Sequence, residues 1–254
     1  MQRAELNKVA VITGATGGIG AAIARTLSSA GYALVLNAPS SEKLCALRAQ
    51  LAGPCIALAG NLRAESMPRD LLDAAIAEFG GCDVCFNNSG LLEAGSIETL
   101  DIERVCNMVR VNVEGSFRMA YTFLQYFVAQ GRGHLVNTSF ALSQRVQPAV
   151  GAYAATKYAV EALSEALRVE LGRTDVRVSC VEPGTVRTSL RGQWKETHVD
   201  SVDAHDPFEP EALARMVLFM LEAQMPAVRQ LHAVGTVPLQ SVSLLVESVA
   251  GVSR

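Results

Sequence analysis

Residues 9–20 read Val9-Ala10-Val11-Ile12-Thr13-Gly14-Ala15-Thr16-Gly17-Gly18-Ile19-Gly20, and a helical pattern begins immediately after them. The first five residues are mostly apolar and β-branched, as in a buried strand. Glycines placed between a strand and a helix let backbone N–H groups approach a pyrophosphate at the positive end of that helix. The stretch therefore predicts a strand, a tight turn and a helix N-terminus that together bind a dinucleotide.

The rest of the chain alternates short β-branched runs with longer helical patterns, which is typical of a parallel sheet covered by helices on both faces. Seven strands are predicted, at residues 9–13, 33–37, 55–59, 84–87, 134–139, 177–182 and 229–234. Helices are predicted at 19–29, 41–51, 65–79, 102–130, 152–171 and 210–223, with left-handed stops at Gly31, Gly80, Gly131 and Gly172. No shift in composition marks a linker, so residues 1–254 are predicted to form a single α/β domain.

Composition excludes several classes of protein. With 254 residues, 50% of them hydrophobic and 19% charged, the chain must bury a large core and is too apolar to be disordered. A net charge of −3 without a basic stripe argues against a nucleic-acid partner or an electrostatic membrane partner. Neither a signal peptide nor a transmembrane helix is expected, because the first residues contain no apolar run and no uncharged stretch reaches about 18 residues. We expect a cytoplasmic protein that binds a small molecule.

Two of the six cysteines, Cys82 and Cys85, form a C-x-x-C motif that could be a redox pair or half of a zinc site. No second C-x-x-C or paired-histidine motif accompanies it, and Cys85 lies in a predicted strand. The sequence therefore favours a structural role for the pair and predicts no metal site.

Residues 185–208 form the longest stretch without a predicted element, and they include Trp194, His198 and His205. Loops of this length in compact domains are often functional. We expect this one to contact the substrate.

The end of the second predicted strand bears on the choice of cofactor. An acidic residue there would bind the adenosine ribose 2′-OH, but the chain reads Asn37-Ala38-Pro39-Ser40-Ser41, with no carboxylate before Glu42. A carboxylate would repel a 2′-phosphate, so its absence permits NADP. Asn37, Ser40 and Ser41 could donate hydrogen bonds, although no arginine is available. The sequence favours NADP over NAD.

Tyr153 and Lys157 are four residues apart and therefore share one face of a predicted helix. A tyrosine hydroxyl is a weak acid and base at neutral pH, and a nearby ammonium is expected to lower its pKa. Such a pair can move a proton to or from a carbonyl or alcohol oxygen while hydride moves on the carbon. Tyr153 and Lys157 are the candidate acid/base pair.

With these motifs the chain resembles the short-chain dehydrogenases/reductases over nearly its whole length. The resemblance rests on Thr13-Gly14-x-x-x-Gly18-x-Gly20, Asn87-Asn88-Ser89-Gly90, Asn112, Tyr153 with Lys157, and Pro183-Gly184 with Thr188. It implies a three-layer Rossmann-like fold with a seven-stranded sheet, a bound NAD(P), and hydride transfer between a carbonyl and an alcohol. Tyr153 would be the acid/base, Lys157 would bind the nicotinamide ribose, and Asn112 would hold a water in a proton relay.

The same resemblance places the cofactor along the carboxyl ends of the strands. The residues expected to line it are Gly14, Thr16, Gly17, Ile19, Gly20, Asn37, Ser40, Asn61, Leu62, Asn88, Ser89, Gly90, Thr138, Tyr153, Lys157, Pro183, Gly184, Val186 and Thr188. Asn61 stands where the family usually has an aspartate facing the adenine, so we expect an altered contact there.

One departure concerns catalysis. The family usually has a serine thirteen residues before the tyrosine, and this chain has Phe140 there. Ser139 could take over through a one-residue shift, Ser143 could reach in, or the site could work without that hydroxyl. Ser139 is awkwardly placed because adjacent side chains of an extended segment point to opposite faces. An alternative function follows: a cofactor-binding protein with weakened or absent catalysis.

The resemblance also bears on assembly and substrate. The helices at 102–130 and 152–171 are the faces the family uses to pair, which predicts a homodimer or homotetramer. The segment 229–240 resembles a branch with NADP-dependent hydroxy-acid dehydrogenases, and the apolar residues 242–252 are expected at an interface or on the sheet edge.

Overall fold

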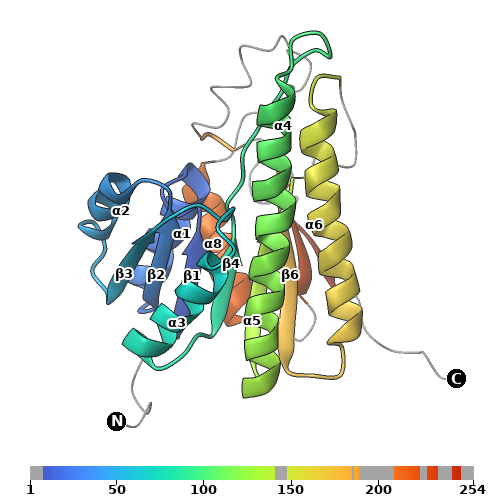
Figure 1. The fold of residues 1–254 in the computed structure, drawn as a ribbon. Helices are drawn as coiled ribbons and strands as arrows, with labels where there is room; N and C mark the ends of the chain where they lie inside the picture. Colours follow the sequence, from blue (N-terminus) through green and yellow to red (C-terminus); the bar gives the residue numbers. More distant parts are fainter. Residues whose placement is uncertain are drawn as a thin grey trace, which may run out of the picture.

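The computed structural model describes residues 8–140, 148–184, 186–188, 209–223, 228–233 and 242–246. Their strands form one sheet, and helices cover both of its faces (Figure 1). The strands are β1 (Val9–Thr13), β2 (Ala33–Ala38), β3 (Cys55–Ala59), β4 (Val84–Asn87), β5 (Gly133–Thr138), β6 (Val176–Pro183), β7 (Val228–Ala233) and β8 (Val242–Val246). The predicted α/β fold is confirmed.

The strand order is β3-β2-β1-β4-β5-β6-β7-β8. Neighbours from β3 to β7 are parallel, whereas β8 pairs with β7 in the antiparallel direction. All seven predicted strands are present, and β8 adds an eighth at the sheet edge, one of the two places expected for the apolar residues after 241. The order reverses between β1 and β4, and in such sheets ligands bind outside the carboxyl ends of the strands at the reversal.

Two apolar layers hold the helices on the sheet. The helices are α1 (Gly18–Ser29), α2 (Ser41–Arg48), α3 (Met67–Phe79), α4 (Ile102–Val109), α5 (Ser116–Gln130), α6 (Gly151–Glu170) and α8 (Pro210–Glu222). Ile23 of α1, Leu44 of α2 and Val217 of α8 belong to the core on one face of the sheet. Leu72 of α3 and Phe123 of α5 belong to the core on the other face, so the molecule has three layers. The long α4–α5 helix lies beside α6 in Figure 1.

The helix predicted at 102–130 is continuous but irregular. A π-helical segment, η1 (Arg110–Gly115), separates α4 from α5 and carries Asn112. Such segments are rare and often mark functional sites. Two of the predicted glycines end helices in the left-handed conformation: Gly80 caps α3 with φ 77°, and Gly131 caps α5 with φ 76°. The prediction at Gly172 is wrong, because α6 ends at Glu170 and Leu171 caps it with φ −91°.

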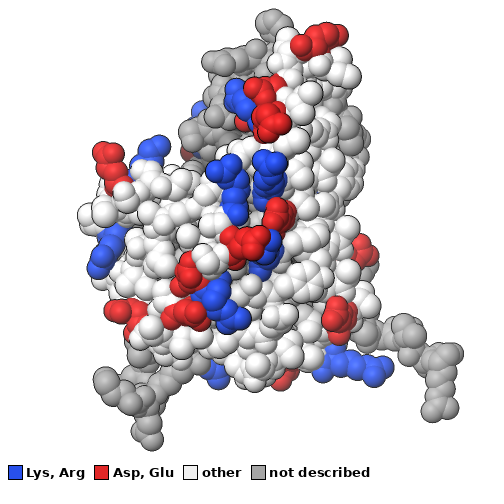
Figure 2. All heavy atoms as spheres, viewed as in Figure 1, with Lys and Arg blue, Asp and Glu red and all other residues white. Residues whose placement is uncertain are grey.

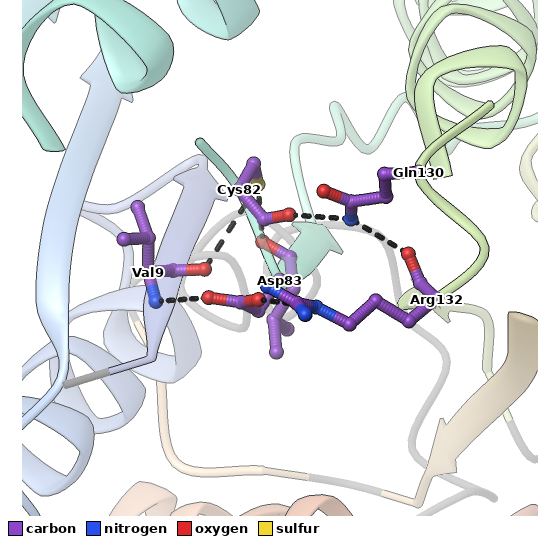
Figure 3. Close-up of polar contacts among 6 residues, drawn as sticks. Val9, Cys82, Asp83, Gln130 and Arg132 are labelled. Carbon is purple, nitrogen blue, oxygen red and sulfur yellow. Dashed lines mark hydrogen bonds and ion pairs between the residues drawn. The ribbon is translucent and has the colours of Figure 1, made fainter. Parts of the chain in front are cut away.

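The C-x-x-C motif takes part in a network of hydrogen bonds at the edge of the sheet where β1 and β4 begin (Figure 3). The Cys82 thiol contacts the carbonyl oxygen of Val84 at 3.3 Å, and Gln130 donates to the Cys82 carbonyl at 2.9 Å. Asp83 accepts from the Val9 N–H at 2.9 Å and pairs with Arg132 at 3.6 Å. These contacts join β1, β4 and the end of α5, which agrees with a structural role for the motif.

Candidate functional site

The glycine turn between β1 and α1 is too crowded for side chains. Gly14 has φ +61°, and a Cβ on it would lie 3.0 Å from the Asn88 side-chain nitrogen. A Cβ on Gly20 would collide with the carbonyl oxygen of Gly14. Glycine is therefore required at both positions, because only a bare backbone allows the turn to close this tightly.

The N-terminus of α1 presents backbone donors that nothing in the turn caps. Gly17 is the N-cap, it makes no side-chain capping bond, and the first turn contains no acidic residue. The free N–H groups and the helix dipole favour an anion at this end. The turn therefore fits the pyrophosphate of a dinucleotide.

Thr13 ties the turn to the end of β4, a role the sequence reasoning missed. Its hydroxyl oxygen accepts from the backbone N–H of Asn88 at 2.9 Å and of Ser89 at 3.0 Å. The Asn88 side chain donates back to the Thr13 carbonyl at 3.2 Å. The Thr-Gly pair at the end of the strand was the available signal. The predicted residues Gly14, Asn88 and Ser89 are thereby brought together.

The polar residues predicted to bind the cofactor near the ends of β2 and β3 already make hydrogen bonds within the protein. The Asn37 amide, 1% exposed, donates to the carbonyl oxygens of Leu58 at 3.0 Å and Gly60 at 3.3 Å. Ser40 caps α2 by accepting from the Lys43 N–H at 3.2 Å. Asn61 accepts from the Arg63 N–H at 3.0 Å. Asn37 therefore shapes the edge of the sheet, whereas the Ser40 hydroxyl keeps its proton for a ligand.

Tyr153 and Lys157 lie on α6, buried against the end of β5. The Lys157 Nζ donates to the Thr138 carbonyl at 3.0 Å and lies 5.7 Å from the centroid of the Tyr153 ring. A Cβ on Gly90 would lie 3.4 Å from this Nζ, so Gly90 keeps the space open. Burial raises the pKa of Tyr153. This differs from the predicted lowering, because in the protein alone the cost of removing a phenolate from water dominates.

Asn112 joins η1 to the loop after β4 and to α6. Its side chain accepts from the Leu91 N–H at 2.8 Å and donates to the Leu91 carbonyl at 2.9 Å. It also donates to the Thr156 hydroxyl at 3.1 Å, and that hydroxyl donates to the Tyr153 carbonyl at 2.7 Å. Thr156 is a site residue that the sequence did not reveal. The chain of bonds fixes α6, and with it Tyr153, relative to η1.

Phe140 and Ser139 occupy different sides of the chain at the end of β5. The Phe140 ring packs edge-to-face on the Tyr153 ring, with centroids 5.6 Å apart. The Ser139 hydroxyl instead donates to the Glu161 carboxylate and to the Lys157 carbonyl at 3.3 Å. The space beside Tyr153 is therefore aromatic, whereas the Ser139 hydroxyl is bound to α6.

The remaining predicted residues lie around the same edge where they are described. Leu62, Pro183, Gly184 and Val186 are buried, and Thr188 is partly buried. Thr188 lies against Gly18, where a Cβ would come within 2.6 Å of its methyl carbon. Thr16 and Gly17 belong to the glycine turn, and Ile19 lies in the first turn of α1. Ser143, Trp194, His198 and His205 lie outside the described residues.

The buried ammonium of Lys157 predicts a measurable cost in stability. Burial lowers its pKa from 10.5 to about 8, which corresponds to roughly 3 kcal/mol. We expect Lys157→Met to raise the free energy of unfolding at pH 7 by about 1–2 kcal/mol, after the loss of one hydrogen bond. The unfolded chain binds the extra proton between pH 8 and 10.5, so the gain should be full below pH 8. Above pH 8 it should fall by about 1.4 kcal/mol per pH unit and change sign before pH 10.5, where only the lost hydrogen bond remains.

Denaturant unfolding of both proteins across this pH range measures the gain. A variant that is less stable than the original protein at pH 7 would contradict the prediction.

Comparisons with known proteins identify the family. The profile named short chain dehydrogenase matches residues 8–199. An uncharacterized oxidoreductase of Staphylococcus epidermidis is 33% identical over 183 residues, which are 72% of this chain and 80% of that protein. The chain belongs to the short-chain dehydrogenases and is an oxidoreductase acting on carbonyl or CH–OH groups.

Solved structures agree. A metagenomic short-chain oxidoreductase in complex with NADP is 29% identical, with a TM-score of 0.77 and coverage of 91% of this chain and 98% of that one. The 3-ketoacyl-(acyl-carrier-protein) reductase of Brucella melitensis, complexed with NADH, is 25% identical, with a TM-score of 0.79 and coverage of 86% and 92%. Among the described residues no helix is long and apolar enough to span a membrane, and no cluster of acidic, cysteine or histidine side chains could hold a metal ion.

Proposed function

We propose that the chain interconverts a carbonyl and a secondary alcohol by hydride transfer, with NADP(H) as cofactor and Tyr153 as the acid/base. The observation that carries the proposal is that Tyr153, Lys157 and Asn112 meet at the carboxyl edge of the sheet that also holds the glycine turn. A packed core requires none of these three polar side chains there. When bound, a nicotinamide ring supplies the carbon that gives or takes the hydride.

The chain's own residues handle the proton. The Tyr153 hydroxyl donates a proton to the carbonyl oxygen in the reductive direction and accepts it in the oxidative direction. The Lys157 ammonium, 5.7 Å from the ring centroid, favours the phenolate and binds the ribose next to the nicotinamide. Asn112 positions α6 through Thr156 and holds a water of the proton relay beside η1.

The binding residues follow the edge of the sheet. The α1 N-terminus with Gly14, Thr16, Gly17, Ile19 and Gly20 receives the pyrophosphate, and Asn61 and Leu62 face the adenine. The middle of the site is lined by Asn88, Ser89, Gly90 and Thr138. The nicotinamide end is lined by Pro183, Gly184, Val186 and Thr188. The substrate is proposed to be bound by the segment 185–208, of which only residues 186–188 are among the described residues.

The enzymatic proposal has an alternative that Phe140 favours: a cofactor-binding protein with weakened or absent catalysis. Binding of NADPH, followed by oxidation of NADPH against a panel of ketones and aldehydes, separates the two. Binding with turnover of any carbonyl supports the enzyme, and tight binding without turnover across the panel supports the alternative. Failure to bind either nicotinamide cofactor would contradict both.

Preference for NADP rests on the end of β2. The Asn37 side chain is engaged by β3, and no carboxylate stands between Asn37 and Ser41 to repel a 2′-phosphate. The Ser40 and Ser41 hydroxyls at the start of α2 are the proposed donors to that phosphate. Solved relatives carry NADP in one case and NADH in another, so the choice must come from this chain's own turn.

Pro39 is exposed in this turn and provides a matched pair of variants. We expect Pro39→Arg to tighten NADPH binding about tenfold by a charge-assisted bond to the 2′-phosphate, and Pro39→Asp to weaken it by a similar factor. NADH lacks that phosphate and serves as the control ligand. Titration of cofactor fluorescence gives both dissociation constants. Equal ratios of NADH to NADPH affinity in the two variants would place the 2′-site elsewhere.

A second copy of the chain is the proposed partner of the α5 and α6 face. Tyr121 and Val128 of α5 are each 48% exposed, and Tyr158 and Val169 of α6 are 40% and 80% exposed. Within each helix the spacing of seven or eleven residues puts the pair on one face. Figure 2 shows mostly uncharged atoms over α6. A homodimer or homotetramer would cover this surface.

We expect Val169→Glu to shift the protein to smaller species in sedimentation velocity, because a charge at the interface must be desolvated. Ile76→Glu on α3, where Ile76 is 39% exposed, is the matched control and should leave the sedimentation coefficient unchanged. A protein that is monomeric before substitution at micromolar concentration would contradict the proposal.

The reducing cytoplasm is the proposed location of the protein, and its six free cysteines are compatible with that compartment.

A further inference from the structure

A polar junction around Ser139 joins the ends of β5 and β6 to α6, the helix that carries Tyr153. Ser139 at its centre is 2% exposed, and its N–H donates to the Val181 carbonyl at 2.8 Å. Its hydroxyl donates to the Lys157 carbonyl at 3.3 Å and to the Glu161 carboxylate. One residue therefore fixes α6 against the ends of two strands.

Lys157 depends on the same junction. Its Nζ donates at 3.0 Å to the carbonyl of Thr138, the residue immediately before Ser139. Any sliding of α6 along β5 would move this nitrogen away from Thr138 and remove the hydrogen bond that orients the Lys157 side chain. The Ser139–Glu161 bond lies one helical turn beyond Lys157 and opposes that sliding.

Glu161 also brings charge to the junction. Lys157 faces Glu161 and Tyr153 on α6 and Cys180 on β6. Burial raises the pKa of the Cys180 thiol, which also faces Glu182, Glu161 and Arg168, so this thiol is neutral near pH 7. Burial lowers the pKa of Lys157 to about 8, and the Glu161 carboxylate opposes this shift. The Cys180 thiol carries no charge at that pH, so it cannot oppose the shift as a thiolate would. Of these neighbours, Glu161 is the carboxylate that opposes loss of the Lys157 proton.

We propose that Glu161 is a positioning residue for Lys157: through Ser139 it fixes α6 on β5, and its carboxylate, one helical turn along α6 from Lys157, is the counter-charge of that buried ammonium. The inference rests on the proposed function for its catalytic meaning. It gives Ser139 a supporting role in place of direct contact with the reacting oxygen. Glu161 also sets the alkaline limit of carbonyl reduction, because Lys157 loses its proton at a lower pH than the Tyr153 hydroxyl does.

Two variants separate charge from position. Glu161→Gln keeps an acceptor for Ser139 and removes the charge, whereas Ser139→Ala keeps the charge and removes the bond. Glu165→Gln, an exposed neighbour on α6, is the matched control. Lysine side-chain NMR on the full chain without cofactor reports the Lys157 titration directly, with Lys157→Met identifying its signal.

We expect Glu161→Gln to lower the midpoint of this titration by about one pH unit, and the alkaline limb of kcat by the same amount. Ser139→Ala should leave the midpoint within about 0.3 units and lower kcat roughly tenfold at unchanged KM for the carbonyl. Glu165→Gln should change neither. An unchanged Lys157 midpoint in Glu161→Gln overturns the proposal, as does full kcat in Ser139→Ala.

The NMR titration needs no turnover, so it tests the role of Glu161 independently of the proposed enzymatic function. If no carbonyl is reduced, the proposed function fails, while a lowered midpoint in Glu161→Gln still supports the charge role of Glu161. If turnover is normal and the midpoint does not move, the proposal for Glu161 fails alone.

Discussion

Tyr153→Phe lowers kcat for carbonyl reduction by roughly 10²- to 10⁴-fold, the range that general acid catalysis contributes. The substitution removes one hydroxyl and keeps the ring. That ring packs edge-to-face on Phe140 at 5.6 Å, so the local packing should survive. Because burial raises the pKa of Tyr153, the hydroxyl is protonated at neutral pH and ready to donate to a carbonyl.

Steady-state kinetics with the best carbonyl of the panel, together with the NADPH dissociation constant, test this result. The dissociation constant should change less than about threefold, since the hydroxyl acts on the substrate oxygen. The control is Tyr158→Phe, an exposed tyrosine on the same helix. If Tyr153→Phe keeps a tenth or more of the original kcat, another group must donate the proton.

Phe140→Ser raises kcat by about 10- to 100-fold. One preorganised donor to a reacting oxygen contributes roughly 10²- to 10³-fold, and Phe140 stands where this family usually supplies that donor. The ring lies against Tyr153, so a hydroxyl at this position is placed beside the acid. Part of the gain is lost because removing the half-buried ring leaves space next to Tyr153.

Phe140→Ala is the matched control, because it removes the same ring without adding a hydroxyl. Kinetics of the three proteins on one substrate series decide the cause. A similar rise in the alanine variant would mean that the ring merely obstructs the substrate. A fall in both variants would mean that the ring is part of the binding surface.

The site could be read from the sequence where short-range geometry determines it. Tyr153 and Lys157 share a helical face because of their spacing, and the crowding at Gly14 and Gly20 follows from a strand that turns at once into a helix. Asn37 was predicted as a donor to the cofactor, but its amide donates to Leu58 of β3 and to Gly60 just after that strand. That contact depends on the pairing of β2 with β3, which no local pattern contains.

The sequence by itself determined the parallel sheet, the glycine turn between β1 and α1, and the shared helical face of Tyr153 and Lys157, since each follows from periodicity, glycine placement or helical spacing. Only the tertiary structure decided the rest. It formed the π-helical segment η1 in the long helix, from which Asn112 reaches Leu91 and Thr156. It also turned the Ser139 hydroxyl to Glu161 and the Phe140 ring to Tyr153. These contacts join residues far apart in the chain, so their geometry exists only after the helices have packed on the sheet.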